Sequence, residues 1–273
     1  MSGDRLSGLQ VIQHDDTKHY KFYRISSKER LNGTPYNFSV LFGNDSRFDR
    51  VTECHLISAS IPNVMNNISA DLGNNIFTAN ASIAGPINVL FVDGYYNTNQ
   101  VIARLESEIN LIIAPSTISI TQNPITQKLV FSVIGESIQY DNTGLNFTLG
   151  ITENIPAVAS VSAQALPNLT GNTMIYIHSR DLGQNVTYLS GNGEVNDVNG
   201  AFVIPVNVPY GVHQTYEGNE NLDRQVYGNA GRSIKGLQIV LRGNNGRLLT
   251  ELSDNFESVI TLKLLYHTGT GNT

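Results

Sequence analysis

Residues 51–63 read VTECHLISASIPN, and residues 259–267 read VITLKLLYH. Both runs alternate apolar and polar residues or carry β-branched and aromatic side chains, the pattern of half-buried antiparallel strands. Two similar runs lie near them in the sequence, YNFSVLF at 36–42 and LQIVLR at 237–242. The strongest strand signals therefore stand near the two ends of the chain, and a sheet that unites them is closed by long-range pairing. This arrangement predicts a β-sandwich of Greek-key or jelly-roll type.

The second half of the chain holds six strand candidates of the sandwich, and these include the two C-terminal runs quoted above. Together with the two N-terminal runs they make eight, the number of strands in a jelly roll. Pro205 falls inside one of them and cannot donate to a ladder, which predicts an edge or bulged strand there. The candidates are 173–178, 185–189, 201–208, 222–227, 234–241 and 259–266.

In the middle of the chain the hydrophobic period changes from that of a strand to that of a helix. From 97 to 113 apolar residues recur at helical spacing, with charged residues on the opposite face. Asn97 and Gln100 stand at the N-cap and N3 positions, a pattern close to a capping box. Pro115 ends the segment. We therefore expect one amphipathic helix here.

Strand signals flank this helix. The run 87–92 (INVLFV) precedes it, and a hairpin of 117–121 and 128–133 follows it. The run 145–151 (LNFTLGI) is compatible with a further short strand. Helix and hairpin together predict a small core of their own, inserted between the second and third strands of the sandwich.

The expected fold class is therefore all-β: a single eight-stranded jelly-roll β-sandwich with an inserted small α+β domain containing one amphipathic helix. The jelly roll would consist of residues 21–71 and 170–267, and the insertion domain of residues 72–169. Residues 1–20 lack sustained periodicity and read as a flexible arm that partners order. Residues 268–273 form a C-terminal tail.

Composition excludes several functional classes. Only 15% of the 273 residues are charged, against about 25% in an average soluble domain. The formal net charge of −6, without any basic run, argues against nucleic-acid binding. No apolar run approaches the ~20 residues that span a bilayer, and residues 1–21 do not read as a signal peptide, so we expect no membrane insertion. The single cysteine, Cys54, lies in an apolar strand and is expected to be a buried small hydrophobe.

A search for catalytic and metal-binding motifs finds no phosphate-binding Gly-rich loop, no Gly-x-Ser-x-Gly elbow and no Cys-x-x-Cys pair. The strongest metal-like pattern is the His-x-Asp of His14 and Asp16, which could take His213 or Arg232 as a distal partner. Both of its residues, however, lie in the polar arm, where no core strand would hold them rigid.

The remaining candidates are isolated. His55, His178 and His267 each stand alone on an expected strand, unlike the closely spaced ligands of a cupin. Glu106 and Glu108 are read as helix-surface charges that face different directions. We expect no catalytic, cofactor-binding or metal-ligating residue and no cofactor, and hence no enzyme. The loop carboxylates with no evident partner are Asp141, Glu153, Glu194 and Asp197.

Short motifs follow one another in a fixed order along most of the chain after the arm. In the first half they are 36–42, 51–63 and the Gly94-Tyr95-Tyr96 that opens the helix. In the second half they are 174–179 (MIYIHS), Ile204-Pro205-Val206 with Tyr210-Gly211, 237–242 leading into Gly246-Arg247, and 259–266. In this ordered set the chain resembles the penton, or minor capsid, proteins of virophages and Maverick/Polinton-type DNA viruses.

The resemblance implies a non-enzymatic structural protein of the virion, synthesised in the host cytosol or in a viral factory. Such a protein forms homopentamers that plug the fivefold vertices of an icosahedral shell, beside trimers of a double jelly-roll major capsid protein. The jelly roll would lie in the shell and the insertion domain would rise from it. Deletion of residues 1–20 should then leave a folded protein that no longer enters shells.

A jelly-roll carbohydrate- or receptor-binding module of a virion is the alternative. Aromatic faces and amide groups suit sugar rings, and several tyrosines stand beside Gly and Asn, although tyrosine is also a common strand residue. Loops of the insertion domain would then hold a receptor or glycan. The tyrosines are Tyr95, Tyr96, Tyr188, Tyr210 and Tyr216.

Overall fold

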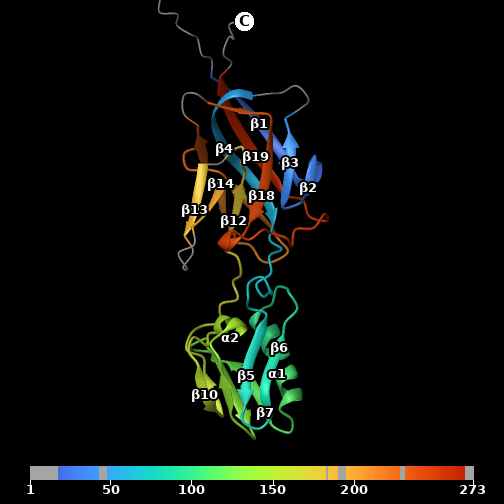
Figure 1. The fold of residues 1–273 in the computed structure, drawn as a ribbon, viewed down its shortest axis with the longest axis vertical. Coiled ribbons are helices and arrows are strands. Elements are labelled where there is room, and N and C mark those ends of the chain that lie inside the picture. Colours follow the sequence, from blue (N-terminus) through green and yellow to red (C-terminus); the bar gives the residue numbers. More distant parts are fainter. Residues whose placement is uncertain (1–17, 43–47, 183, 190–194, 228–230, 268–273) are drawn as a thin grey trace, which may run out of the picture.

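The chain folds into two stacked units (Figure 1). The backbone passes between them twice, and these two crossings lie within residues 63–75 and 163–173. One unit is the jelly roll, and the other carries both α-helices that occur among the described residues. No helix of the described residues is long and apolar enough to cross a membrane. The structure is a computed structural model that describes residues 18–42, 48–182, 184–189, 195–227 and 231–267.

The first sheet of the jelly roll joins the beginning of the described chain to its end. Its order is β1-β19-β4-β15, and β16 and β17 also pair with β4. Because these three short strands share one partner, they act together as a single interrupted strand along β4. The bounds are β1 (Lys18–Ser26), β19 (Val259–His267), β4 (Phe48–Pro62), β15 (His213–Glu217), β16 (Arg224–Val226) and β17 (Arg232–Ile234).

The second sheet has the order β13-β14-β12-β18-β3-β2. It too places strands from the two halves of the chain side by side, since β18 lies between β12 and β3. The short helical turns η1 (Ser27–Glu29) and η2 (Asn244–Gly246) lie in connections. The strand bounds are β13 (Gln184–Leu189), β14 (Val195–Pro205), β12 (Met174–His178), β18 (Gly236–Arg242), β3 (Asn37–Leu41) and β2 (Asn32–Thr34).

The core of the jelly roll lies between these two sheets. Alternate residues of each strand point inward, which is why the sequence alternates there. Leu264 and Cys54 are opposite one another in the register of β19 and β4, and both are fully buried. Ile239 and Phe38 form the corresponding buried pair in the second sheet. Burial raises the pKa of the Cys54 thiol, so the side chain stays neutral as the expected small hydrophobe.

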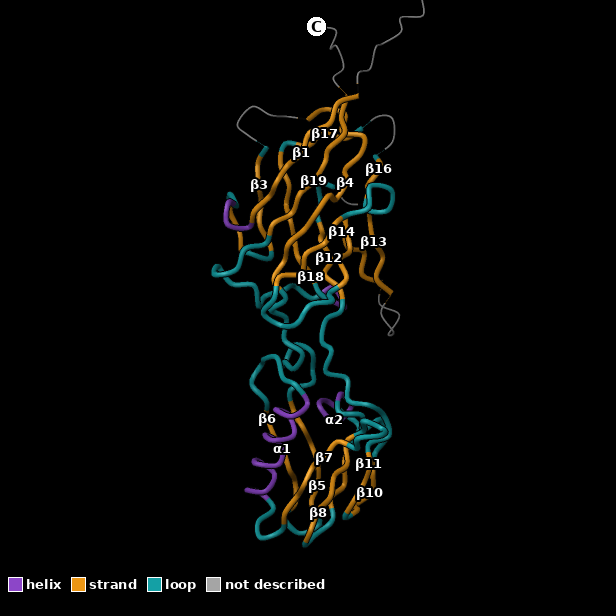
Figure 2. Tube along the Cα trace, turned by 180° about the vertical axis from the view of Figure 1, so that it is seen from behind, coloured by secondary structure: helices purple, strands orange, loops and turns teal. Residues whose placement is uncertain are grey.

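The inserted unit combines two antiparallel sheets with the helices (Figure 2). The sheet orders are β10-β9-β5-β6 and β11-β8-β7. The bounds are β5 (Ile76–Ala81), β6 (Gly85–Leu90), α1 (Thr98–Ile112), β7 (Thr117–Gln122), β8 (Leu129–Ile134), β9 (Ile138–Tyr140), α2 (Gly144–Thr148), β10 (Ile155–Val158) and β11 (Ser160–Ser162).

A second hydrophobic cluster, separate from that of the jelly roll, fills this unit. Helix α1 contributes Val101, Leu105 and Ile109, one apolar stripe at helical spacing. Phe131 of β8 lies 5.2 Å from the ring of Tyr140 and 6.4 Å from that of Phe77, measured between ring centroids. Burial raises the pKa of Tyr140. The inserted unit therefore packs around its own aromatic centre.

The predicted helix and hairpin are present where we expected them. Asn97 caps α1, and its side chain and that of Gln100 form both bonds of a capping box. The hairpin strands are β7 and β8. The extra strand predicted at 145–151 is wrong, because residues 144–148 form α2 instead. There Asn146 is fully buried and bonds the backbone of Thr78 and Asp141, which holds the segment in a turn.

The jelly-roll fold class is confirmed, two details of the prediction are corrected, and the open alternative at Pro205 is resolved. The two sheets hold six strands each among the described residues, rather than eight in all. Strand β1 begins at Lys18, so residues 18–20 belong to the sheet and not to a free arm. Pro205 ends β14, which lies between β13 and β12 and so is not an edge strand, but the pairing of β14 with β12 contains a register shift at Ile177 and His178, which agrees with the bulged alternative. The next residue, Val206, donates its N–H to the Thr173 carbonyl at 2.8 Å, so Pro205 stands at the alternate position of the antiparallel ladder, where β12 requires no donor.

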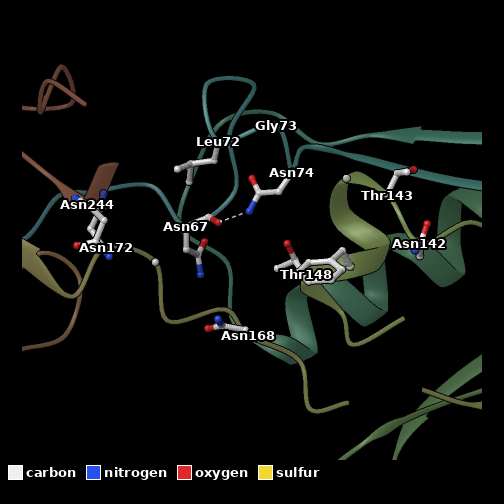
Figure 3. Close-up of a pocket in the computed structure, with 13 residues that line it drawn as sticks. Asn67, Leu72, Gly73, Asn74, Asn142, Thr143, Thr148, Asn168, Asn172 and Asn244 are labelled. Carbon is white, nitrogen blue, oxygen red and sulfur yellow. Dashed lines mark hydrogen bonds between the residues drawn. The ribbon is translucent and has the colours of Figure 1, made fainter. Parts of the chain in front are cut away.

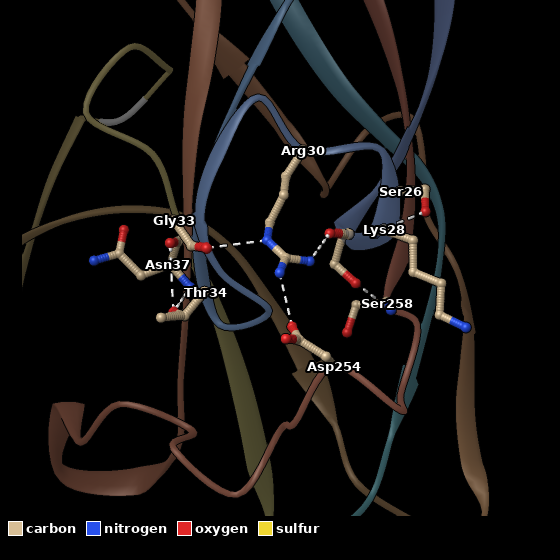
Figure 4. Close-up of polar contacts among 9 residues, drawn as sticks. Ser26, Lys28, Arg30, Gly33, Thr34, Asn37, Asp254 and Ser258 are labelled. Atoms are coloured by element: carbon tan, nitrogen blue, oxygen red, sulfur yellow. Dashed lines mark hydrogen bonds and ion pairs between the residues drawn. The ribbon is translucent and has the colours of Figure 1, made fainter.

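A polar cluster ties the start of the described chain to the segment before β19 (Figure 4). Arg30 donates to the carbonyls of Gly33 at 3.0 Å and Ser27 at 2.8 Å, and pairs with Asp254 at 2.7 Å. Ser27 and Ser258 exchange two further bonds. Gly33 has φ +97° and a Cβ there would lie 2.2 Å from a backbone oxygen, so only glycine fits.

Candidate functional site

The junction of the two units is built on a buried asparagine. Asn67 is only 2% exposed. Its Nδ2 donates to the carbonyls of Tyr96 and Leu169, both at 2.8 Å, and its Oδ1 accepts from the Tyr96 N–H at 2.8 Å. Its backbone carbonyl accepts from Asn74 Nδ2 at 2.8 Å. One side chain therefore fastens both crossings of the backbone to the segment before α1.

Arg247, which follows β18 in the jelly roll, contacts the first crossing, the one that contains Asn67. Its guanidinium pairs with Glu251 on its own side. It also donates to Ser69 Oγ at 3.3 Å and lies 3.5 Å from the carboxylate of Asp71. Charge-assisted bonds of a planar guanidinium fix orientation as well as distance. Arg247 thus links the jelly roll to the first crossing from the other side.

A pocket of about 530 Å³ opens beside Asn67, with residues of both units around it (Figure 3). Asn172 and Asn244 line it from the jelly-roll side, and α2 with its flanking residues lines it from the other. None of the described side chains that form its wall is ionisable. The lining consists of Asn67, Leu72, Gly73, Asn74, Asn142, Thr143, Gly144, Phe147, Thr148, Asn168, Gly171, Asn172 and Asn244.

A smaller pocket of about 280 Å³ shares Asn172 with the first. Tyr95 and Val206 are among its lining residues. Tyr95 stacks on Tyr210 with ring centroids 4.8 Å apart and planes 18° apart. This pair adds an aromatic contact between the segment before α1 and a loop of the jelly roll.

The tyrosine platform considered from the sequence is only partly assembled. Tyr95 and Tyr210 meet, but the Tyr96 hydroxyl donates to the Val92 carbonyl at 2.8 Å. Tyr216 donates to Asp223 at 2.8 Å, and this bond raises the pKa of Tyr216. The side chain of Tyr188 lies outside the described residues. No shared sugar platform of these tyrosines therefore forms among the described residues.

The outer face of the first sheet carries exposed aromatic residues. Tyr20 and Phe22 of β1 are 65% and 53% exposed, and their rings meet edge-on at 5.7 Å. Lys263 lies 5.4 Å from the centre of the Tyr20 ring and pairs with Glu220 at 3.1 Å. Across β19, Glu53 of β4 accepts from Lys18 of β1 at 2.8 Å. That hydrogen bond lowers the pKa of Glu53.

The metal and catalytic candidates do not come together. His14 and Asp16 lie outside the described residues. His213 pairs with Pro62 and Arg232 with Val51, eleven positions apart on β4, which is roughly 36 Å along a strand. No group of three potential metal ligands occurs among the described residues.

Two of the isolated candidates, His55 and Glu106, have structural partners. His55 lies 3.0 Å from Glu53 and is almost fully buried. Glu106 is not a free surface charge as expected from the sequence, because it accepts the Ile120 N–H of β7 at 2.6 Å. The side chains of Glu194 and Asp197 lie outside the described residues. Within the described residues, His178, His267, Asp141 and Glu153 join no cluster of potential metal ligands.

Sequence reasoning missed the junction of the two units, because Asn67 and Asn172 look like ordinary loop asparagines.

Comparisons with known proteins agree with the fold. A scan against family models finds no match, and a search of curated proteins also finds none. Among solved structures, the chain is similar to a crystal structure of a mavirus penton protein, with a TM-score of 0.53 and 10% sequence identity. The similarity covers 92% of this chain and 100% of that one. The likeness therefore extends over both units, and it establishes a penton-like fold.

Proposed function

We propose that this protein is a structural subunit of a viral capsid that forms homopentamers at icosahedral vertices. The observation that carries the proposal is the chain-long likeness to a penton protein, which includes the unit inserted between β4 and β12. A non-catalytic role agrees with the scattered positions of the titratable side chains. The location in the virion and the contact with a major capsid protein follow from the same proposal.

The outer face of the first sheet is the surface we assign to contacts between subunits. Tyr20 and Phe22 lie on β1, whose outer edge pairs with no described strand. Aromatic residues are enriched at the centre of an interface, whereas polar and charged residues are common at its rim. In a ring, one patch meets a different patch of the next copy. The outer face of the second sheet offers such an apolar patch, which includes Met174 and Val203.

The unaltered protein should run in light scattering at about five times the 29.8 kDa of one chain, alone or after mixing with the shell protein. The double substitution Tyr20→Ser and Phe22→Ser should shift this mass to that of a monomer, because it removes the exposed aromatic contact area. Ile125→Ser is the matched control, since Ile125 is also exposed but lies in the β7–β8 turn. A trimer of the unaltered protein, or pentamers of the double variant, would contradict the proposal.

The arm is tested by a deletion that respects the strand. Because residues 18–20 pair with β19, a deletion of residues 1–20 would damage β1 as well as the arm. Deletion of residues 1–17 should leave thermal unfolding unchanged and should abolish incorporation into shells. Shell incorporation is measured by co-sedimentation with assembled particles. Normal incorporation of this truncation would disprove the role of the arm and leave the pentamer proposal standing.

A further inference from the structure

We infer that the larger pocket at the junction binds a neutral carbohydrate residue. Its volume of about 530 Å³ falls within the range of roughly 300–1,000 Å³ that small-molecule sites occupy. The described wall has no ionisable side chain, so a charged ligand would lose its hydration without gaining a counter-charge. The occupant is therefore expected to be uncharged.

The polar groups of the wall match hydroxyl groups. A sugar hydroxyl both donates and accepts, and an asparagine amide offers one group of each kind. Asn168 Nδ2, Asn172 Nδ2 and Asn142 Oδ1 have no hydrogen-bond partner among the described residues, although the other amide atom of each is bonded. Thr143 precedes α2, yet its hydroxyl makes no capping bond to that helix. These atoms supply donors and acceptors at several points of the wall.

An apolar face completes the site. Phe147 is 60% exposed although it lies on α2 beside the fully buried Leu145. Leu72 lies across the pocket from α2 (Figure 3). The C–H face of a pyranose ring suits an exposed aromatic ring, whereas its hydroxyl edge suits the amides. Neutral amides, free hydroxyls and one exposed phenyl ring in the same pocket thus indicate a neutral hexose.

Two glycines with positive φ and the bonds of Asn67 shape the wall of this pocket. Gly73 has φ +66° and leaves open space where a Cβ would stand. Gly171 has φ +68°, and a Cβ there would lie 3.1 Å from Asn67. Both Nδ2 hydrogens and the Oδ1 of Asn67 are bonded to backbone groups of Leu169, in the second crossing, and of Tyr96, so the wall is held before any ligand arrives. Such preorganisation lowers the entropic cost of binding.

The test is saturation-transfer NMR on the full chain with four probes at millimolar concentration. Methyl β-D-galactoside, methyl α-D-mannoside and N-acetyl-D-glucosamine are the neutral probes, and N-acetylneuraminic acid is the anionic one. At least one neutral sugar should receive saturation from the aromatic protons, and the anionic sugar should not. Binding of none of the neutral sugars, or preferential binding of the anionic sugar, would overturn the inference.

Substitutions place the binding in this pocket. Phe147→Ala should raise the Kd of the bound sugar roughly fivefold to tenfold, since one ring contact contributes about 1 kcal/mol to the binding free energy. Thr143→Ala should also weaken it while the fold is kept, because this exposed hydroxyl has no structural partner among the described residues. Leu111→Ala removes an apolar side chain of α1 that is also largely exposed, and it should leave the affinity for the sugar unchanged. Unchanged affinity in both pocket variants would refute the site, whatever the oligomeric state.

Discussion

Replacement of Asn67 by aspartate should lower the free energy of unfolding by about 3–5 kcal/mol, the cost of an unpaired buried charge. The two side chains have nearly the same shape, but the donor Nδ2 becomes an oxygen. That oxygen would face the carbonyls of Tyr96 and Leu169 without a hydrogen to share. With Asn67 only 2% exposed, water cannot readily replace the lost bonds.

Denaturant unfolding followed by circular dichroism measures this loss. Asn88→Asp is the matched control, because Asn88 is exposed on β6 and should tolerate the same chemical change. The loss at position 67 should also shrink as the pH falls toward about 4, where the introduced carboxyl takes up a proton and regains a donor. A variant as stable as the control at pH 7 would mean that the junction does not depend on this amide.

Phe131→Ala should destabilise the inserted unit by about 3–5 kcal/mol, the usual cost of truncating a buried aromatic side chain. Phe131 is fully buried and contacts the rings of Phe77 and Tyr140. Because the two hydrophobic clusters are separate, the decrease in stability should be confined to the inserted unit. Hydrogen exchange should therefore accelerate in α1 and β5 while β4 and β19 keep their protection.

Phe147→Ala is the control for this experiment. It makes the same chemical change in the same unit, but its side chain is largely exposed, so its effect on stability should stay within about 0.5 kcal/mol. This near-neutral result also qualifies the variant for the sugar-binding test. Equal acceleration of exchange in β4 and β19 for Phe131→Ala would show that the two units unfold as one.

The local elements could be predicted because their signals are local. The capping box of Asn97 and Gln100 and the stripe of Val101, Leu105 and Ile109 lie within one helix, and α1 begins and ends close to the predicted residues. The strand at 145–151 was predicted wrongly, because Asn146 finds backbone partners at Thr78, far away in sequence. The polar run 18–21 gave no strand signal, since β1 is an edge strand whose side chains are mostly exposed.

By itself, the sequence determined the all-β class, the jelly roll closed by its two ends and the place of the helix, because hydrophobic period and capping are properties of neighbouring residues. Only the tertiary structure decided what the asparagines do. Asn67 and Asn146 bridge backbone groups that are distant in sequence, and Asn142, Asn168 and Asn172 converge on one pocket. An amide has no hydrophobic period, so its role depends on which carbonyls the fold brings within about 3 Å of it.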